Sequence, residues 1–275
     1  MELTELLTLD LTPPGLPKAA ALLLKELARP HPNMRRINQL FASDPALASR
    51  LLQLANSQAY QCPRQVVGIS EALALVGLAQ LRTVVAASPL YTATKAVPGL
   101  QMSQFWRYSQ QTAKLARSLA GIVRQNQVAA FTAGLLHALG ELPILMADPD
   151  KVRMVNDLVP PLDLRRGAME RRIFGYTYAH VTAGMAKRWQ LPSVVVNAIR
   201  HQLAPFEKQG YEPLAGIVHL AVWRTRVREA GFSEREMAVT FPDKVGLVLG
   251  LDIDMVLQQD PIDWTVRPDM EDDLV

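Results

Sequence analysis

The histidines are the side chains of this sequence with the widest chemistry, because imidazole binds metals and can carry a proton near neutral pH. The sequence holds five of them, at positions 31, 137, 180, 201 and 219. No two lie four residues apart, the spacing that places a pair on one face of a helix. A histidine alone on an apolar helix is more often a core residue than a ligand, so a shared site requires the fold to bring distant histidines together.

His137 lies in a strongly apolar stretch, AGLLHALGELPIL, at residues 133–145. The apolar side chains follow helical spacing, so we expect one helix that carries His137 into the interior. Gly134 and Gly140 are spaced for close helix contact or helix termination rather than for a phosphate-binding loop. The sequence contains no P-loop, dinucleotide-binding or serine-hydrolase motif, and Cys62, its single cysteine, excludes an internal disulfide.

Four arginines close together, Arg165, Arg166, Arg171 and Arg172, are candidates for binding an acidic protein surface or a nucleotide phosphate. At 100° per residue, Arg165 and Arg172 share one face of a helix, with the other two on either side. The favoured alternative is a solvated helix surface.

Two tryptophans, Trp106 and Trp189, are candidates for stacking on a ligand. Packing in the core or between the two halves of the chain is the favoured interpretation for both. A second group of arginines, Arg224, Arg226 and Arg228, is interpreted as a solvated helix face like the first.

The composition is that of a globular protein, with 49% hydrophobic and 20% charged residues. Aromatic residues make up only 6%, which argues against a surface of stacked nucleic-acid bases. No apolar run approaches the roughly 20 residues of a membrane span, and the start of the chain does not resemble a signal peptide, so we expect a cytoplasmic protein. The net charge of +3 combines a basic body with an acidic tail, because eight of the 26 acidic residues follow residue 251, against one arginine.

Helical spacing and capping residues recur along the chain, and sustained strand alternation is absent, so the predicted fold is all-α. Asn33 is a candidate cap of one helix, Ser43 or Asp44 of the next, and Ser70 of a single helix that extends to residue 88. A connector follows at 88–100. The remaining predicted helices cover residues 17–29, 103–122, 163–173, 178–189, 192–202 and 213–230, with a turn near 148–150 and a weaker segment at 241–257.

Five of these segments, taken in order, resemble successive parts of the HDOD domain, a bacterial signalling relative of the HD-type phosphohydrolases. They are DPALASRLLQLANSQAY, ISEALALVGLAQLR, QFWRYSQQTAKLARSLA, AGLLHALGELPIL and RWQLP with AIRHQ, and the resemblance extends from about Pro13 to His201. It implies a two-lobed helical domain, with an N-terminal lobe at 1–95, an HD-like C-terminal lobe at 96–230, and a helical extension and acidic tail at 231–275.

The HD-type enzymes hold divalent metals with histidines and aspartates, and the resemblance carries those positions onto this chain. They fall at Tyr108, His137, Ala138, His180, His201 and Val222. Ala138 and Val222 stand where carboxylates are expected, although hard cations depend on carboxylates, and a phenol is a poor ligand at neutral pH. The three histidines could still gather an incidental zinc ion. The resemblance therefore implies a degenerate site with no catalytic residues, no functional metal and no cofactor.

HDOD domains typically serve as output or adaptor modules, so the resemblance implies a non-catalytic signal-transduction protein that binds another signalling protein. The cleft between the lobes is the candidate surface, and the identity of the partner is open. The alternative is a metal-dependent phosphohydrolase acting on a nucleotide. A third hypothesis, binding of nucleic acid or a nucleotide through the basic face, predicts an affinity that falls steeply with salt.

Overall fold

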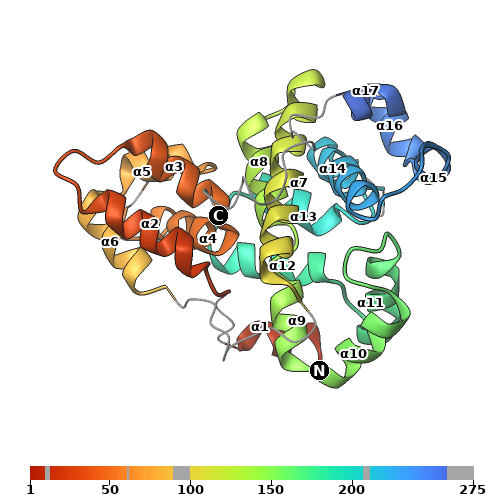
Figure 1. Ribbon diagram of the computed structural model, residues 1–275, viewed down its shortest axis with the longest axis horizontal. Helices are drawn as coiled ribbons and strands as arrows, with labels where there is room; N and C mark the ends of the chain where they lie inside the picture. The colour runs from red at the N-terminus through yellow and green to blue at the C-terminus, as the bar shows by residue number, and fades with distance from the viewer. Residues whose placement is uncertain (10–12, 61, 89–99, 207–210, 259–275) are drawn as a thin grey trace.

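The computed structural model describes residues 1–9, 13–60, 62–88, 100–206 and 211–258, and the regular secondary structure in these ranges is helical. The predicted all-α fold is confirmed. The helices form two groups that lie side by side in Figure 1. We call α2–α6 the N-terminal lobe and α7–α14 the C-terminal lobe.

The N-terminal lobe is built from five short helices whose ends are fixed by the residues that cap them. They are α2 (Pro17–Leu27), α3 (Met34–Ser43), α4 (Pro45–Ala55), α5 (Ile69–Leu75) and α6 (Leu78–Ala86). The Asn33 side chain accepts a hydrogen bond from the backbone N–H of Arg36, as predicted for the start of α3. Of the two candidates for α4, Asp44 is the cap, because its carboxylate accepts from the N–H groups of Ala46 and Leu47.

The prediction of one helix capped by Ser70 is wrong. The chain forms α5 and α6 instead, which meet at a bend of 117°. Gly68 precedes α5. The backbone is extended at Val76, which ends α5, and at Gly77, which precedes α6. The apolar pattern continues across the bend, but glycine has little preference for the helical conformation and lets the chain turn.

The C-terminal lobe is organised around α7 (Met102–Ile122), the longest helix of the described residues. α7 packs along α8 (Gln127–Leu136) and α14 (Pro213–Glu229). Gly134 allows the approach of α8, since a Cβ atom there would lie 2.8 Å from the Cα atom of Ala113 on α7. The lobe is completed by α9 (Glu141–Ala147), α10 (Pro149–Leu158), α11 (Arg166–Phe174), α12 (Tyr178–Arg188) and α13 (Ser193–His201).

The predicted single helix through residues 133–145 is interrupted, because α8 ends at Leu136 and α9 begins at Glu141. The turn between them brings Gly140 against α12, where a Cβ atom would lie 2.3 Å from the carbonyl oxygen of Tyr178. The Thr182 hydroxyl accepts a hydrogen bond from the N–H of Gly140 at 2.8 Å. This contact with α12 redirects the chain and sets Glu141 at the start of a new helix.

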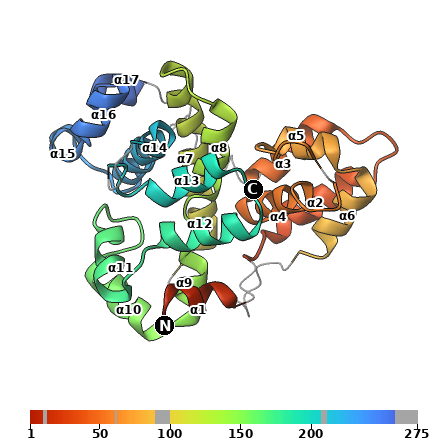
Figure 2. The ribbon, with the colours of Figure 1, turned by 180° about the vertical axis from the view of Figure 1, so that it is seen from behind.

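Two peripheral parts pack on the C-terminal lobe. The first helix, α1 (Leu3–Thr8), lies against α9 and α12, although the N-terminal lobe follows it in the sequence (Figure 2). The extension comprises α15 (Glu234–Thr240), α16 (Asp243–Leu249) and α17 (Ile253–Gln258), of which α16 and α17 contact α14. Most of the predicted connector and the acidic tail, residues 89–99 and 259–275, lie outside the described residues.

One helical stretch among the described residues, Gln127–Ala147, is long and apolar enough to cross a membrane, and the bent pair α5–α6 meets the same criteria only as a broken span. In the first stretch, 89% of the apolar window is buried inside the fold. Such burial is typical of a core helix.

Candidate functional site

Arg226 of α14 lies at the centre of a buried polar cluster, and only 1% of it is exposed. Its Nε atom donates a hydrogen bond to the Tyr108 hydroxyl at 3.0 Å, and Nη2 donates to the Tyr178 hydroxyl at 3.1 Å. Nη1 donates to the carbonyl oxygen of Asp163 at 2.9 Å. We call Tyr108, Glu141, Tyr178 and Arg226 the Arg226 cluster. It joins α7, α9, α12 and α14.

The charge of Arg226 is retained although the side chain is buried. Burial acts to lower its pKa, but the two tyrosines and Glu141 outweigh burial, so that the pKa is raised above its ordinary value. The guanidinium carbon lies 5.8 Å from the ring centroid of Tyr108 and 5.5 Å from that of Tyr178, within the range of a cation–π interaction. Burial raises the pKa of Tyr108 to about 12, so its phenol stays neutral.

Glu141 is the carboxylate of the cluster. Its Oε1 atom lies 3.9 Å from Nη2 of Arg226, and neither of its oxygens has a hydrogen-bond partner among the described residues. Burial raises the pKa of Glu141 to about 7, although Arg166 and Arg226 act to lower it. Glu141 therefore faces the guanidinium of Arg226 across 3.9 Å, and with its pKa at about 7 it is partly protonated near neutral pH.

A second buried ion pair adjoins the cluster. Nε of Arg166 donates to Oε1 of Glu170 at 2.9 Å, and Nη1 donates to Asn156 and to the carbonyl oxygen of Val159. The other Glu170 oxygen accepts from the N–H of Tyr178 at 2.8 Å, which links the pair to the Arg226 cluster. The prediction that Arg166 belongs to a solvated or ligand-binding surface is therefore wrong, because Glu170, one turn further along α11, compensates its charge in the interior.

His137 is fully buried, as predicted, but it follows the end of α8 instead of lying within one continuous helix. Its Nδ1 atom lies 2.7 Å from the carbonyl oxygen of Gly134, and its ring meets that of Tyr108 edge to face at 4.8 Å. Nε2 has no hydrogen-bond partner in the described part of the chain. Burial lowers the pKa of His137 to about 3, so the imidazole is neutral.

The other positions carried over from the HD-type site have separate structural roles. Ala138 is fully buried in the core. His180 helps to cap α12, where its Nδ1 atom accepts from the N–H of Thr177 at 3.2 Å. His201 ends α13, and Val222 lines a cavity of about 450 Å³ that Arg226 also lines. Of the six positions, the structure thus brings Tyr108 and His137 into direct contact.

The residues present do not fit the divalent cation that the HD-type resemblance implies. Ala138 and Val222 offer no donor atom, and the hydroxyl of Tyr108 accepts a hydrogen bond from a guanidinium. Arg226 adds a positive charge beside His137 and acts to lower its pKa. Within the described ranges, no three His, Cys, Asp or Glu side chains are grouped as a metal site.

The three remaining arginines of the predicted group, Arg165, Arg171 and Arg172, are exposed. Arg165 pairs with Asp163 at 2.7 Å. Because Arg166 points inward, the four side chains do not form one binding surface. The interpretation as a solvated helix surface therefore holds only for the three exposed arginines.

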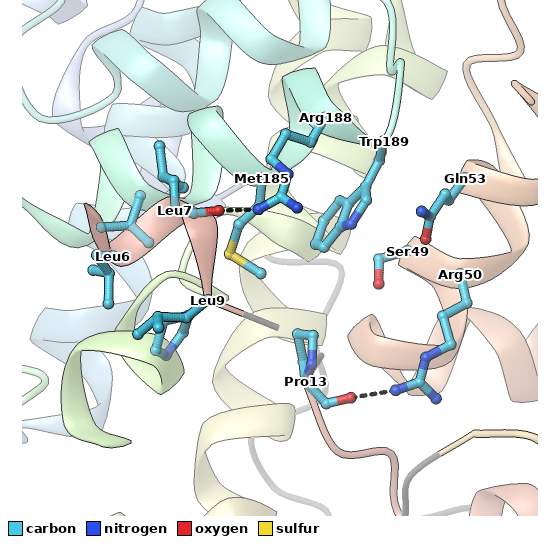
Figure 3. Close-up of a pocket in the computed structure, with 12 residues that line it drawn as sticks. Leu6, Leu7, Leu9, Pro13, Ser49, Arg50, Gln53, Met185, Arg188 and Trp189 are labelled. Carbon is cyan, nitrogen blue, oxygen red and sulfur yellow. Dashed lines mark hydrogen bonds between the residues drawn. The ribbon is translucent and has the colours of Figure 1, made fainter. Parts of the chain in front are cut away.

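Trp106 is fully buried and packs against Phe105, with ring centroids 4.9 Å apart, so it is a core residue rather than a stacking platform. Trp189 is half-buried and lines a cavity of about 210 Å³ between α1, α4 and α12 (Figure 3). In the same cavity, Arg50 donates to the carbonyl oxygen of Pro13 and Arg188 to that of Leu7. Both arginines tie the start of the chain to the junction of the lobes.

A larger groove runs between the lobes, with α3 and α5 on one side and α7 and α8 on the other. We call it the inter-lobe groove. Its volume is about 610 Å³, and its lining includes Arg36, Leu40, Ile69, Lys114, Arg117 and Phe131. Two hydrogen bonds join the lobes beside it, from Thr132 to the carbonyl oxygen of Val67 at 2.8 Å and from Gln110 to that of Ser43 at 2.7 Å.

The sequence did not reveal that Glu141, Glu170, Tyr178 and Arg226 belong to one buried polar network. Arg226 stands between Arg224 and Arg228, a pattern that predicts a solvated helix face. A usable signal was present for Glu141, which is a charged residue inside an otherwise apolar stretch. Charged residues at such positions are rarely buried unless they are paired. The helices that supply the partners are distant in the sequence, so the pairing itself appears only in the fold.

The fold is a two-lobed helical domain, and the Arg226 cluster lies buried in its C-terminal lobe. A family model for the HDOD domain matches residues 14–205, and the chain belongs to this family.

Solved structures resemble this fold over most of its length. The MmoQ response regulator of Methylococcus capsulatus superposes with a TM-score of 0.71 at 22% identity, covering 92% of this chain and all of the other. A virulence factor of Campylobacter jejuni gives 0.65 at 18% identity, covering 94% and 97%. A structure named as a candidate phosphohydrolase, from Shewanella amazonensis, gives 0.55 at 27% identity, covering 94% and 92%.

A protein of Treponema pallidum is 28% identical over 214 residues. The match covers 76% of this chain and 41% of that relative, so the chain spans about two fifths of the relative's length.

Proposed function

We propose that this protein is a non-catalytic signalling module that acts by binding another protein. Membership of the HDOD family supports a role in signal transduction, and the solved relative MmoQ is described as a response regulator. The inter-lobe groove is the surface that we assign to partner binding, because it combines apolar walls with exposed cations.

The single observation that supports a non-catalytic role is the position of Arg226. Its guanidinium hydrogen-bonds to Tyr108, whose ring contacts His137, and these two residues occupy positions where the HD-type enzymes hold metal. A divalent cation there would meet a fixed positive charge in a region of low dielectric, where repulsion is strong. With Ala138 and Val222 in place of carboxylates, too little negative charge remains to offset that repulsion.

The second candidate is a metal-dependent phosphohydrolase that acts on a nucleotide. It is favoured by the likeness to the Shewanella amazonensis protein and by the histidines retained at positions 137, 180 and 201. The arrangement of His180 argues against it, since Nδ1 of that ring is engaged in the cap of α12.

A phosphodiesterase assay separates the two functions. The purified chain is incubated with Mn²⁺, Fe²⁺ or Mg²⁺ and an activated phosphodiester, and its rate is compared with that of His137→Ala. We expect the hydrolysis rate with either protein to equal the rate measured with the metal ion and no protein. Metal-dependent turnover that disappears in His137→Ala would establish the phosphohydrolase and reject the proposed function.

A further inference from the structure

The inter-lobe groove carries an excess of positive charge. Lys114 and Arg117 lie three residues apart on α7, so they project from the same face of that helix, and both are exposed. Arg36 lines the groove from α3, and its Nε atom lies 3.9 Å from Oε2 of Glu26, so the excess charge comes mainly from Lys114 and Arg117. Glu71 is the acidic residue of the lining, and its carboxylate accepts a hydrogen bond from the N–H of Val67. The groove therefore favours an anionic occupant.

The same groove offers apolar surface next to these cations. Val128 of α8 is 50% exposed and Phe131 is partly exposed, while Leu40 and Ile69 form buried parts of the lining. Large exposed apolar side chains beside a charged rim are typical of sites that bind a peptide segment. The occupant that fits is a short segment that alternates acidic and apolar residues.

Residues 259–275 of this chain have that composition. The segment contains six acidic residues and one arginine, Arg267. Large apolar residues, Ile262, Trp264, Val266, Met270 and Leu274, are interspersed among the acidic ones.

The segment is long enough to reach the groove. It follows α17, which ends at Gln258 and packs on α14. Its 17 residues span at most about 56 Å when extended. A folded chain of this length is about 50 Å across, so the far end of the segment can reach the groove. Trp264, six residues after Gln258, can lie up to about 20 Å from the end of α17.

We propose that residues 259–275 bind the inter-lobe groove of their own chain. The acidic side chains face Lys114, Arg117 and Arg36, and the apolar side chains cover Val128 and Phe131. The contact itself depends only on the groove and the segment. Its consequence rests on the proposed function: a bound segment competes with a partner protein for the same surface.

Trp264 reports the contact in the full-length chain. The fluorescence of Trp264 is obtained by subtracting the emission of Trp264→Phe from that of the unaltered chain, because the other three tryptophans are common to both. Acrylamide quenching of this difference signal measures how accessible Trp264 is to solvent. Reversing the groove charge with Lys114→Glu and Arg117→Glu releases the segment, and we expect the quenching constant of Trp264 to rise about twofold or more. Salt of about 0.5 M screens the same attraction and produces a rise in the unaltered chain.

The matched control reverses two exposed lysines on α2, with Lys18→Glu and Lys25→Glu, and must leave the Trp264 quenching constant unchanged. A rescue variant adds Asp269→Lys and Asp272→Lys to the groove variant and restores protection. Circular dichroism verifies that each variant is folded. Equal quenching of Trp264 in the unaltered and groove-reversed chains, with both folded, would overturn the proposal.

Protection of Trp264 that increases with protein concentration would instead assign the groove to the tail of a second copy, and the intramolecular contact would be rejected. None of these measurements involves hydrolysis or a partner. The proposed function can therefore fail in the phosphodiesterase assay while the tail contact stands, and the reverse also holds.

Discussion

Three hydrogen bonds and two aromatic rings surround the guanidinium of Arg226, so the C-terminal lobe carries a cation supplied by the chain itself. Glu141 provides the opposite charge, and Tyr108 lies in contact with His137. At these positions the HD-type resemblance leads one to expect a metal ion and its carboxylates. In this chain an arginine, a glutamate and two phenols hold the four helices together instead.

Replacing Arg226 by methionine should destabilise the protein by about 3–5 kcal/mol, because removal of one member of a buried ion pair leaves the other uncompensated. The midpoint and slope of urea unfolding measure the change in the free energy of unfolding. Arg172→Met, which removes an exposed arginine on α11, is the control and should change that free energy by less than about 0.5 kcal/mol. A small effect in Arg226→Met would show that the cluster contributes little to the fold.

The pH dependence of stability reports the burial of His137. The pKa of its imidazole is lowered from 6.5 to about 3 in the folded state, so below pH 6.5 the unfolded chain binds a proton that the folded chain does not. The stability contributed by this group is therefore present above pH 6.5 and is lost as the pH falls toward 3. At pH 5 the loss is about 2 kcal/mol.

His137→Phe removes this proton linkage. The free energy of unfolding of the unaltered chain should fall by about 2 kcal/mol more than that of the variant between pH 7.5 and pH 5. His31→Gln, at an exposed histidine of the N-terminal lobe, serves as the control and should follow the unaltered chain. Parallel curves for His137→Phe and the unaltered chain would mean that His137 titrates normally in the folded protein.

At the scale of the elements, local sequence signals were sufficient where the structure depends on local interactions. The long helix α7 and the caps Asn33 and Asp44 lie where the spacing and residue types predict them. Both helices that were predicted as continuous and are interrupted, at Gly77 and between Leu136 and Glu141, retain apolar spacing through the break.

The break after Leu136 depends on a contact that the sequence does not show. Gly140 approaches α12 so closely that no side chain fits between them. The same contact explains why the candidate site could be predicted only in part. The resemblance identified Tyr108 and His137, which do meet, whereas the partners of Arg226 come from helices that only the tertiary structure brings together.

At the scale of the whole molecule, two lobes enclose a basic, partly apolar groove, and the residues carried over from a metal site are part of the core or of a helix cap. The chain shares this two-lobed fold with MmoQ over 92% of its length. In the proposals made above, partner binding is assigned to the inter-lobe groove, and residues 259–275 occupy the groove when no partner is bound.

We propose that the buried centre holds Arg226 as its cation in place of a catalytic metal, and a Mn²⁺ titration followed by electron paramagnetic resonance distinguishes the two. The signal of free Mn²⁺ shows how much metal the protein removes from solution. We predict that the unaltered chain and His137→Ala leave the same concentration of Mn²⁺ free in solution. Neither protein should bind Mn²⁺ stoichiometrically. One or two Mn²⁺ ions bound tightly per chain, and lost in His137→Ala, would instead show that His137 belongs to a functional metal site.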